Sequence, residues 1–170
     1  MSAVVFLDID GVCNDDAHYF AAVAGCRTHA EAIVAVLARG LAPVRVARIE
    51  RVCAAVGASV VIVSGWRRHA TVEQIGASLR ASGLTAPVID AVGGVKMSGD
   101  LRAAATREWL AAHPEVSAWV VIDDARDLWA PRDVPAWLAG RLVCPVDGIT
   151  DADADAALAA LRAALNGSAA

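Results

Sequence analysis

Short apolar segments that alternate with helix-length stretches constrain the fold of this chain of 170 residues more than any other feature. Three of these segments are β-branched runs with little polar alternation, at residues 3–7, 59–63 and 118–122. Such runs are typical of parallel strands that are buried on both faces of a sheet. Two shorter segments, at residues 87–89 and 141–143, are further strand candidates.

Alanine-rich stretches of helix length lie between the strand candidates, at residues 43–56, 71–82, 100–112 and 151–165. Thr71 and Asp151 stand where two of these helices would begin, and acidic residues follow both of them. The alternation of strand and helix predicts an α/β fold with a Rossmann-like, doubly wound parallel sheet. We expect a single domain over residues 1–170, with a small helical insertion at about residues 14–42.

The overall composition excludes several classes of protein. Apolar residues make up 57% of the chain, which is unlike a disordered protein. The net charge of -4 argues against a nucleic-acid binder that depends on bulk positive charge, although a local basic patch stays open. The longest apolar run, at residues 52–63, is too short to span a bilayer, and residues 1–10 lack the basic segment of a secretory signal. We therefore expect a cytoplasmic protein with no membrane partner.

Polar residues with reactive side chains stand directly after three of the strand candidates: Asp8 and Asp10, then Ser64, then Asp123 and Asp124. In an open parallel sheet the carboxyl ends of the strands meet at one edge, where ligands bind. Carboxylates crowded together repel one another and require a cation, and oxygen-only ligands favour Mg²⁺. Each acid pair alone is also explained by a turn or a helix N-cap, but the two pairs together indicate one magnesium site.

Three motifs in this order resemble those of the haloacid dehalogenase-like (HAD) phosphohydrolases. Residues 6–12 read FLDIDGV, residues 61–65 read VIVSG, and residues 121–124 read VIDD. The order and spacing fit from residue 3 to about residue 145. Together with Asn14, the SGWR sequence at residues 64–67 and the DGIT sequence at residues 147–150, they are similar to the small HAD domains found with RNA-repair proteins. Those domains are relatives of the phosphatase half of polynucleotide kinase-phosphatases.

The resemblance implies a phosphomonoesterase that works through an aspartyl-phosphate. Asp8 would be the nucleophile, and Asp10 would protonate the leaving oxygen and then deprotonate the hydrolytic water. Mg²⁺ would be held by Asp8, by the main-chain carbonyl of Asp10, and by Asp123 or Asp124.

The resemblance also implies residues that hold the phosphoryl group. Ser64 and the N–H of Gly65 would hydrogen-bond its oxygens, and Arg67 is a further candidate. A cation must also hold the phosphoryl group and restrain the nucleophile. Arg102 at the head of a helix is the first candidate, and Lys96, the single lysine of the chain, is the alternative.

The small insertion at residues 14–42 leaves little room for a full cap domain, so we expect an open crevice. An open site fits a phosphate at the end of a large molecule, such as a nucleic-acid 3′-phosphate. The alternatives are a nucleotide or small-metabolite phosphatase, with an oligomer closing the site, and a non-catalytic HAD-fold binding module. The presence of both acids of the first motif argues against a binding module. The sequence leaves open a phosphomutase, and a monomer or a homodimer.

Arg45, Arg48 and Arg51 recur at three-residue spacing within one helix candidate. This spacing indicates one solvated helix face. A track for the phosphate backbone of a nucleic acid is the alternative.

Overall fold

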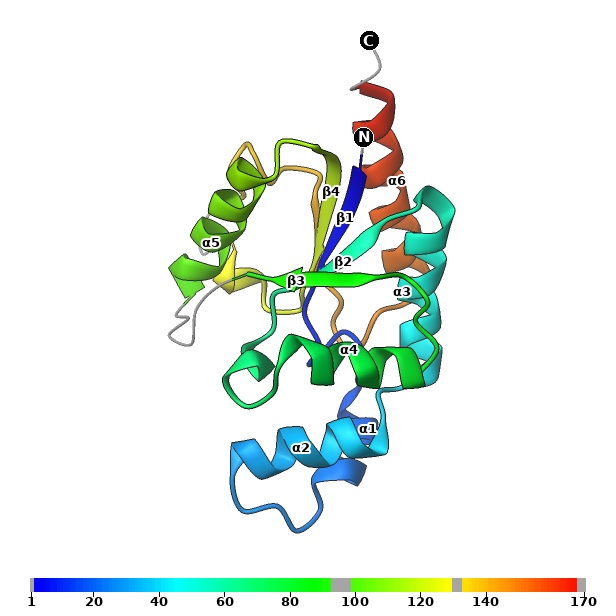
Figure 1. Cartoon of the computed structure of the whole chain (residues 1–170), viewed down its shortest axis with the longest axis vertical. Coiled ribbons are helices and arrows are strands. Elements are labelled where there is room, and N and C mark those ends of the chain that lie inside the picture. Colours follow the sequence, from blue (N-terminus) through cyan, green and yellow to red (C-terminus); the bar gives the residue numbers. More distant parts are fainter. Residues whose placement is uncertain (1, 93–98, 130–132, 168–170) are drawn as a thin grey trace.

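A five-stranded parallel sheet forms the centre of the protein, in a computed structural model that describes residues 2–92, 99–129 and 133–167 (Figure 1). The strand order is β3-β2-β1-β4-β5. The strands are β1 (Ser2–Leu7), β2 (Ser59–Ile62), β3 (Val88–Ala91), β4 (Val116–Ile122) and β5 (Leu142–Val143). This sheet confirms the predicted Rossmann-like α/β fold.

Helices cover both faces of the sheet in the described part of the chain, with α5 on one side and α3 and α6 on the other (Figure 1). The helices are α1 (Asp16–Val23), α2 (His29–Arg39), α3 (Pro43–Val56), α4 (Val72–Ala81), α5 (Gly99–Ala112) and α6 (Asp151–Gly167). Two short 3₁₀ turns, η1 (Gly65–Arg68) and η2 (Arg126–Leu128), follow β2 and β4. No helix of the described residues is long and apolar enough to cross a membrane.

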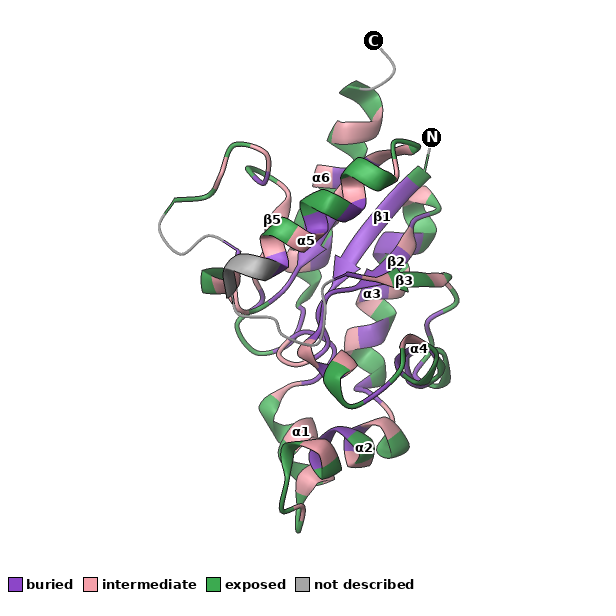
Figure 2. Cartoon of the chain, turned by 60° about the vertical axis from the view of Figure 1, so that its left-hand side comes forward, coloured by how far each residue is buried: buried purple, intermediate pink, exposed green. Residues whose placement is uncertain are grey.

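Successive side chains of β1 point into two different cores. Val5 and Leu7 belong to the larger core, which also contains residues of α3, α4 and α6. Val4 and Phe6 belong to the smaller core on the α5 side, where Phe6 meets Trp109 edge to face at 5.4 Å. Burial on both faces explains why the strand segments are continuously apolar (Figure 2). It also places β1 in the middle of the molecule.

The insertion between β1 and α3 consists of α1 and α2, which lie together beyond the carboxyl end of the sheet (Figure 1). The Ser82 hydroxyl accepts a hydrogen bond from the Leu41 N–H at 2.9 Å, and the Ser78 hydroxyl donates to the Leu37 carbonyl at 3.3 Å. These contacts join the end of α2 to α4. The insertion is therefore fixed to the main body of the fold on one side of the sheet edge.

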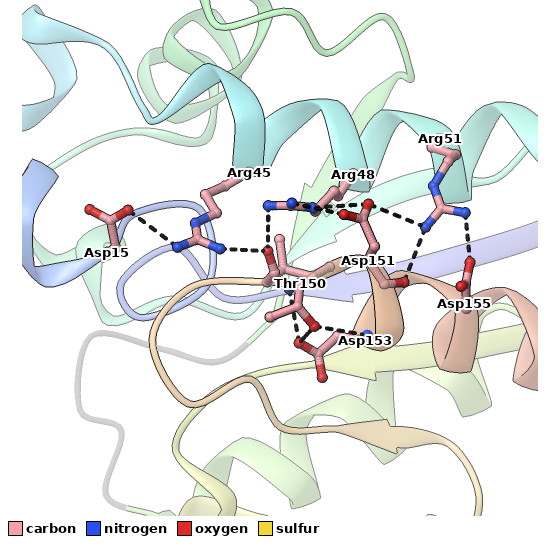
Figure 3. A network of polar contacts seen from close by, with 9 residues as sticks. Asp15, Arg45, Arg48, Arg51, Thr150, Asp151, Asp153 and Asp155 are labelled. Atoms are coloured by element: carbon pink, nitrogen blue, oxygen red, sulfur yellow. Dashed lines mark hydrogen bonds and ion pairs between the residues drawn. The ribbon is translucent and has the colours of Figure 1, made fainter.

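The arginine stripe of α3 is bound to the start of α6 and to the loop after β1 (Figure 3). Arg48 forms a two-pronged ion pair with Asp151, at 3.1 and 2.9 Å, and Arg51 pairs with Asp155 at 2.6 Å. Arg45 pairs with Asp15 at 3.3 Å. The stripe thus differs from the expected solvated face. A phosphate backbone would have to displace these carboxylates, so the structure gives no support to a nucleic-acid track.

Glu50 of α3 fastens the turn that leads into β3. Its carboxylate accepts hydrogen bonds from the Thr85 N–H at 2.7 Å and the Ala86 N–H at 3.1 Å, and from the Thr85 hydroxyl. Burial raises the pKa of Glu50, but these hydrogen bonds more than offset that effect and leave its pKa below the ordinary 4.5. The charged carboxylate therefore stabilises the fold.

Replacing Glu50 by Gln should lower the free energy of unfolding by about 1 kcal/mol at neutral pH, because the charged acceptor is lost. A lowered pKa contributes stability above pH 4.5, and this contribution is lost as the pH falls through the lowered value. Urea unfolding from neutral pH downward should therefore show the Glu50→Gln difference shrinking in acid. Glu108→Gln, on the exposed surface of α5, is the control. A difference that stays constant with pH would contradict the role of the charge.

Candidate active site

The carboxyl ends of β1 and β4 bring three acids together. Leu7 pairs with Ile122 in the sheet register, so the residues that follow the two strands reach the same edge. One carboxylate oxygen from each of Asp8, Asp123 and Asp124 lies within 4.8 Å of the others. This arrangement could hold a divalent cation, because hard oxygen ligands favour Mg²⁺.

Asp8 is 5% exposed and is held by hydrogen bonds at both oxygens. Oδ1 accepts from the Ile9 N–H at 2.7 Å, and Oδ2 accepts from Arg102 Nη1 at 3.0 Å. Burial, and then the charge of Asp123, raise the pKa of Asp8 to about 7, although Arg102, Ser64 and the Ile9 N–H act in the opposite direction. The one arginine does not fully balance the negative charge, so a further cation would favour the ionised form of Asp8.

Asp123 anchors Arg102 and is itself 0% exposed. Its Oδ2 accepts hydrogen bonds from Arg102 and from the indole N–H of Trp129, the latter at 2.6 Å. Its Oδ1 accepts from the Ala125 N–H at 2.9 Å. The indole N–H of Trp129 therefore orients this acid. No sequence pattern indicates that contact, because it depends on how the loop after β4 folds.

Asp124 faces the solvent and lies against Gly11. Gly11 has a φ of +65°, and a Cβ atom built on it would lie 2.1 Å from Asp124 Oδ2. The glycine therefore serves two purposes, since it adopts a left-handed turn and leaves room for the carboxylate. Burial, and then the neighbouring Asp123, raise the pKa of Asp124.

Asp10 is held from one side only. The indole N–H of Trp66 donates a hydrogen bond to Oδ2, whereas the buried Oδ1 has no hydrogen-bond partner among the described residues. Burial raises the pKa of Asp10, and Trp66, His29 and Asn14 lower it less than burial raises it. Sequence reasoning missed the contact from Trp66, although the position of this tryptophan directly after the Ser-Gly pair of the second motif was a usable signal.

Ser64 lies in the same buried region, where it lowers the pKa of Asp8. Its hydroxyl also accepts the Trp66 N–H at 3.3 Å and so caps η1, which begins at Gly65. Arg67 donates a hydrogen bond to the Val92 carbonyl just after β3. Lys96, the alternative cation, lies outside the described residues.

A cavity of about 340 Å³ opens beside Asp10, between α1 and the segment before α6. Its walls are Asp10, Gly11, Asn14, Asp15, Asp16, Tyr19, Phe20, Asp124, Val146 and Asp147. A cavity of about 390 Å³ between α2 and α4 contains none of the predicted site residues. Of the predicted site residues, Asp10 and Asp124 line the 340 Å³ cavity, whereas Asp8, Ser64, Arg102 and Asp123 are not among its walls.

A parallel α/β sheet with an Asp-x-Asp pair after its central strand, and a second acid pair after β4, is the architecture of a HAD-like domain. The family model described as "HAD domain in Swiss Army Knife RNA repair proteins" matches residues 4–154. The chain belongs to this family, which confirms the resemblance seen in its motifs and supports a phosphatase-like function. No significant match was found among curated proteins or among solved structures.

Replacing Gly11 by Ala should displace Asp124 as well as strain the turn. Gly57 is the matched control, because it has a φ of +66° and no atom within 4 Å of a built Cβ. Each substitution should cost about 1–2 kcal/mol of backbone strain. Gly11→Ala should lose more stability than Gly57→Ala in urea unfolding, and should lose the Mg²⁺-induced rise in melting temperature that Gly57→Ala retains. Equal losses and equal Mg²⁺ responses would contradict the contact.

Replacing Trp66 by Phe removes the only hydrogen bond that the structure gives to Asp10 Oδ2 and keeps a buried ring. The pKa of Asp10 should rise further, because the indole N–H stabilises the charged carboxylate. Carboxyl carbon NMR titration measures this shift. Trp109→Phe removes a comparable indole bond, to Asp90 at 2.6 Å, and is the control. An unchanged or lower Asp10 pKa in Trp66→Phe would contradict the interpretation.

Proposed function

We propose that the protein is a Mg²⁺-dependent phosphomonoesterase that forms an aspartyl-phosphate on Asp8. The observation that carries the proposal is the setting of Asp8. It is a buried carboxylate at the end of the central strand, beside Arg102 and two further acids, in a chain of the HAD family. Asp10 follows two residues later in the chain, beside the cavity that opens to solvent.

The oxygen donors at this edge of the sheet fit Mg²⁺. We assign the ion to Asp8, Asp124 and the main-chain carbonyl of Asp10. Asp124 is preferred to Asp123, because Asp124 faces the solvent, whereas Asp123 is fully buried and its Oδ2 accepts hydrogen bonds from both Arg102 and Trp129. When bound, Mg²⁺ would offset the negative charges of the nucleophile and the phosphate.

Arg102 is the proposed cation for the phosphoryl group. Burial lowers its pKa, but Asp8 and Asp123 raise it overall, so the guanidinium keeps its charge. Its Nη1 contacts both acids and thereby restrains the nucleophile. The planar guanidinium also suits phosphate oxygens. Ser64 would supply a hydroxyl to the same group.

In the first chemical step, an oxygen of Asp8 bonds to phosphorus and the bond to the leaving oxygen breaks. Asp10 gives its proton to that oxygen, and its raised pKa favours the protonated form that this role requires. In the second step Asp10 takes a proton from water, which attacks phosphorus and releases phosphate and free Asp8. Trp66 holds one oxygen of Asp10, which leaves Oδ1 for the proton transfers.

The proposed substrate is a phosphorylated nucleoside end. The description of the family names RNA repair proteins and so supports an RNA end, and the small insertion leaves room for such a large substrate. We propose the 3′-phosphate of that end as the group that is removed. A mononucleotide is the other candidate, and the charge of the cavity beside Asp10 favours it, because wall carboxylates such as Asp16 and Asp147 would repel a polyanion. A non-catalytic binding module remains the alternative to an enzyme.

A phosphate-release assay on the purified protein tests the proposal. Its substrates are a 3′-phosphorylated RNA oligonucleotide, mononucleotides and p-nitrophenyl phosphate, each with Mg²⁺ and with EDTA. We expect release that requires the metal and that falls by more than about 10³-fold in Asp8→Asn, because the nucleophile is lost. Glu73→Gln, an exposed change on α4, should keep the wild-type rate.

Two results would overturn the proposal. Equal rates in wild type and Asp8→Asn would show that Asp8 is not the nucleophile. A wild-type protein that releases no phosphate from any of these substrates with Mg²⁺ would instead favour the binding module.

A further inference from the structure

The cavity beside Asp10 must receive the leaving group if Asp10 protonates the leaving oxygen, so this inference rests on the proposed function. At about 340 Å³ the cavity is at the small end of the range for small-molecule sites. Three features of its walls indicate which kind of ligand it binds. They are two aromatic side chains, one buried amide and several carboxylates. The rings and the amide take no part in the chemistry at phosphorus, and of the carboxylates only Asp10 and Asp124 do.

The aromatic wall is formed by Tyr19 and Phe20 of α1. Their rings are 5.8 Å apart and meet edge to face at 76°. Phe20 is 64% exposed, so its ring does little for the core, whereas Tyr19 packs against the larger core. Tyr19 and Asp10 line the same cavity, and Asp10, after burial, contributes to the raised pKa of the Tyr19 hydroxyl. On the other wall Val146 is 97% exposed.

Asn14 supplies the second feature. It is 1% exposed, and neither its amide nitrogen nor its amide oxygen has a hydrogen-bond partner among the described residues. Asn14 lies near enough to Asp10 for a weak, poorly aligned side-chain hydrogen bond, which lowers the pKa of that acid. A buried polar group left unpaired costs about 1–3 kcal/mol. A ligand that offers both a donor and an acceptor would remove that cost.

The third feature is charge. Asp15, Asp16 and Asp147 line the cavity together with Asp10 and Asp124, and no lysine or arginine is among the described wall residues. The nearest described arginine contact, from Arg45, goes to Asp15. In the proposed mechanism Asp10 is protonated and Asp124 binds the metal ion, so Asp16 and Asp147 are the wall carboxylates that would repel a leaving group with a second phosphate. The ligand is therefore polar and aromatic, but not anionic.

We propose that this cavity binds the terminal nucleoside of the substrate. The base stacks on Phe20 and Tyr19, and Asn14 hydrogen-bonds the sugar hydroxyls or the base edge. The carboxylates favour a nucleoside with no second phosphate, so a nucleoside monophosphate binds better than a 3′-phosphorylated RNA end. A simple alkyl phosphate can neither stack on the two rings nor form the proposed hydrogen bonds with the Asn14 amide.

Calorimetric titration of the Asp8→Asn protein tests the base-stacking part without turnover. Adenosine 3′-phosphate should bind roughly 5- to 150-fold more tightly than glycerol 2-phosphate, which has no base. Phe20→Ala should remove most of this preference. Val34→Ala, an exposed apolar change on α2 of the same insertion, should keep it. Absence of the preference, or its survival in Phe20→Ala, would overturn the proposal.

Asn14→Leu tests the polar part, because leucine fills a similar volume without hydrogen-bonding groups. We expect weaker binding of adenosine 3′-phosphate, by about 5-fold or more, with an unchanged or higher melting temperature. A lower melting temperature with unchanged affinity would show that Asn14 is structural. That result would overturn its assignment to the ligand.

The affinities of adenosine 3′-phosphate and of a 3′-phosphorylated RNA oligonucleotide, measured at low salt, decide whether the nucleoside belongs to a mononucleotide or to an RNA end. We expect adenosine 3′-phosphate to bind more tightly than the RNA. Asp147→Asn should reduce this difference in affinity, because it removes one of the repelling carboxylates. Tighter binding of the RNA would overturn the assignment to mononucleotides.

The nucleoside site and the phosphatase activity can be refuted independently of each other. A protein that prefers adenosine 3′-phosphate but releases no phosphate would refute the phosphatase and leave the nucleoside site standing. If Asp8→Asn does not fold, the wild-type protein is titrated with adenosine, which it cannot hydrolyse. No binding of adenosine would then overturn the nucleoside site.

Discussion

Repulsion among carboxylates at one edge of the sheet is the constraint on which the site depends. Parallel strands that end together place Asp8 and Asp123 side by side in a buried region, and Asp124 follows. Arg102 offsets part of this charge through contacts with two of the acids. Burial, and then the charge of Asp123, still raise the pKa of Asp8 to about 7. A site of this kind gains most from a divalent cation and from a cationic or protonated neighbour.

The surrounding loops keep the acids in place through contacts with distant parts of the chain. The N–H groups of Gly148 and Ile149 donate to the carbonyls of Gly11 and Val12, at 2.9 and 3.0 Å. Arg45 of α3 donates to the Ile149 carbonyl at 3.0 Å and also pairs with Asp15 (Figure 3). The arginine stripe therefore has a structural function, because it joins the loop after β1, helix α3 and the start of α6.

Much of the fold follows from local sequence pattern. The predicted strands and helices lie within two residues of those observed, because doubly buried strands and capped helices leave strong local signals. The grouping of Asp8 with Asp123 and Asp124 was also predictable, since parallel strands end at one edge. The indole contact of Trp129 with Asp123 was not, because it depends on a loop conformation that no periodic pattern records. The contact of Trp66 with Asp10 was missed, although the position of Trp66 directly after the second motif was a signal for it.

The different surroundings of Asp123 and Asp124 likewise could not be predicted from the sequence. The two residues are neighbouring aspartates of one motif. Asp123 is nevertheless enclosed by Trp129 and Arg102, whereas Asp124 faces Gly11 and the solvent. The ion pairs of Arg48 and Arg51 with α6 are a second case. Their partners lie about a hundred positions away in the chain, so helical spacing alone suggested a solvated surface.

The central position of β1 has an evolutionary consequence. Its side chains fill both cores, so a substitution there shifts the backbone that carries Asp8 and is poorly tolerated. Phe20 and Val146 are mostly exposed, and exchanging them changes the surface that a leaving group meets at little thermodynamic cost. Core positions such as Val5 and exposed cavity positions such as Phe20 thus occupy separate layers of the molecule, so the wall of the cavity can change while the strand that carries Asp8 stays the same.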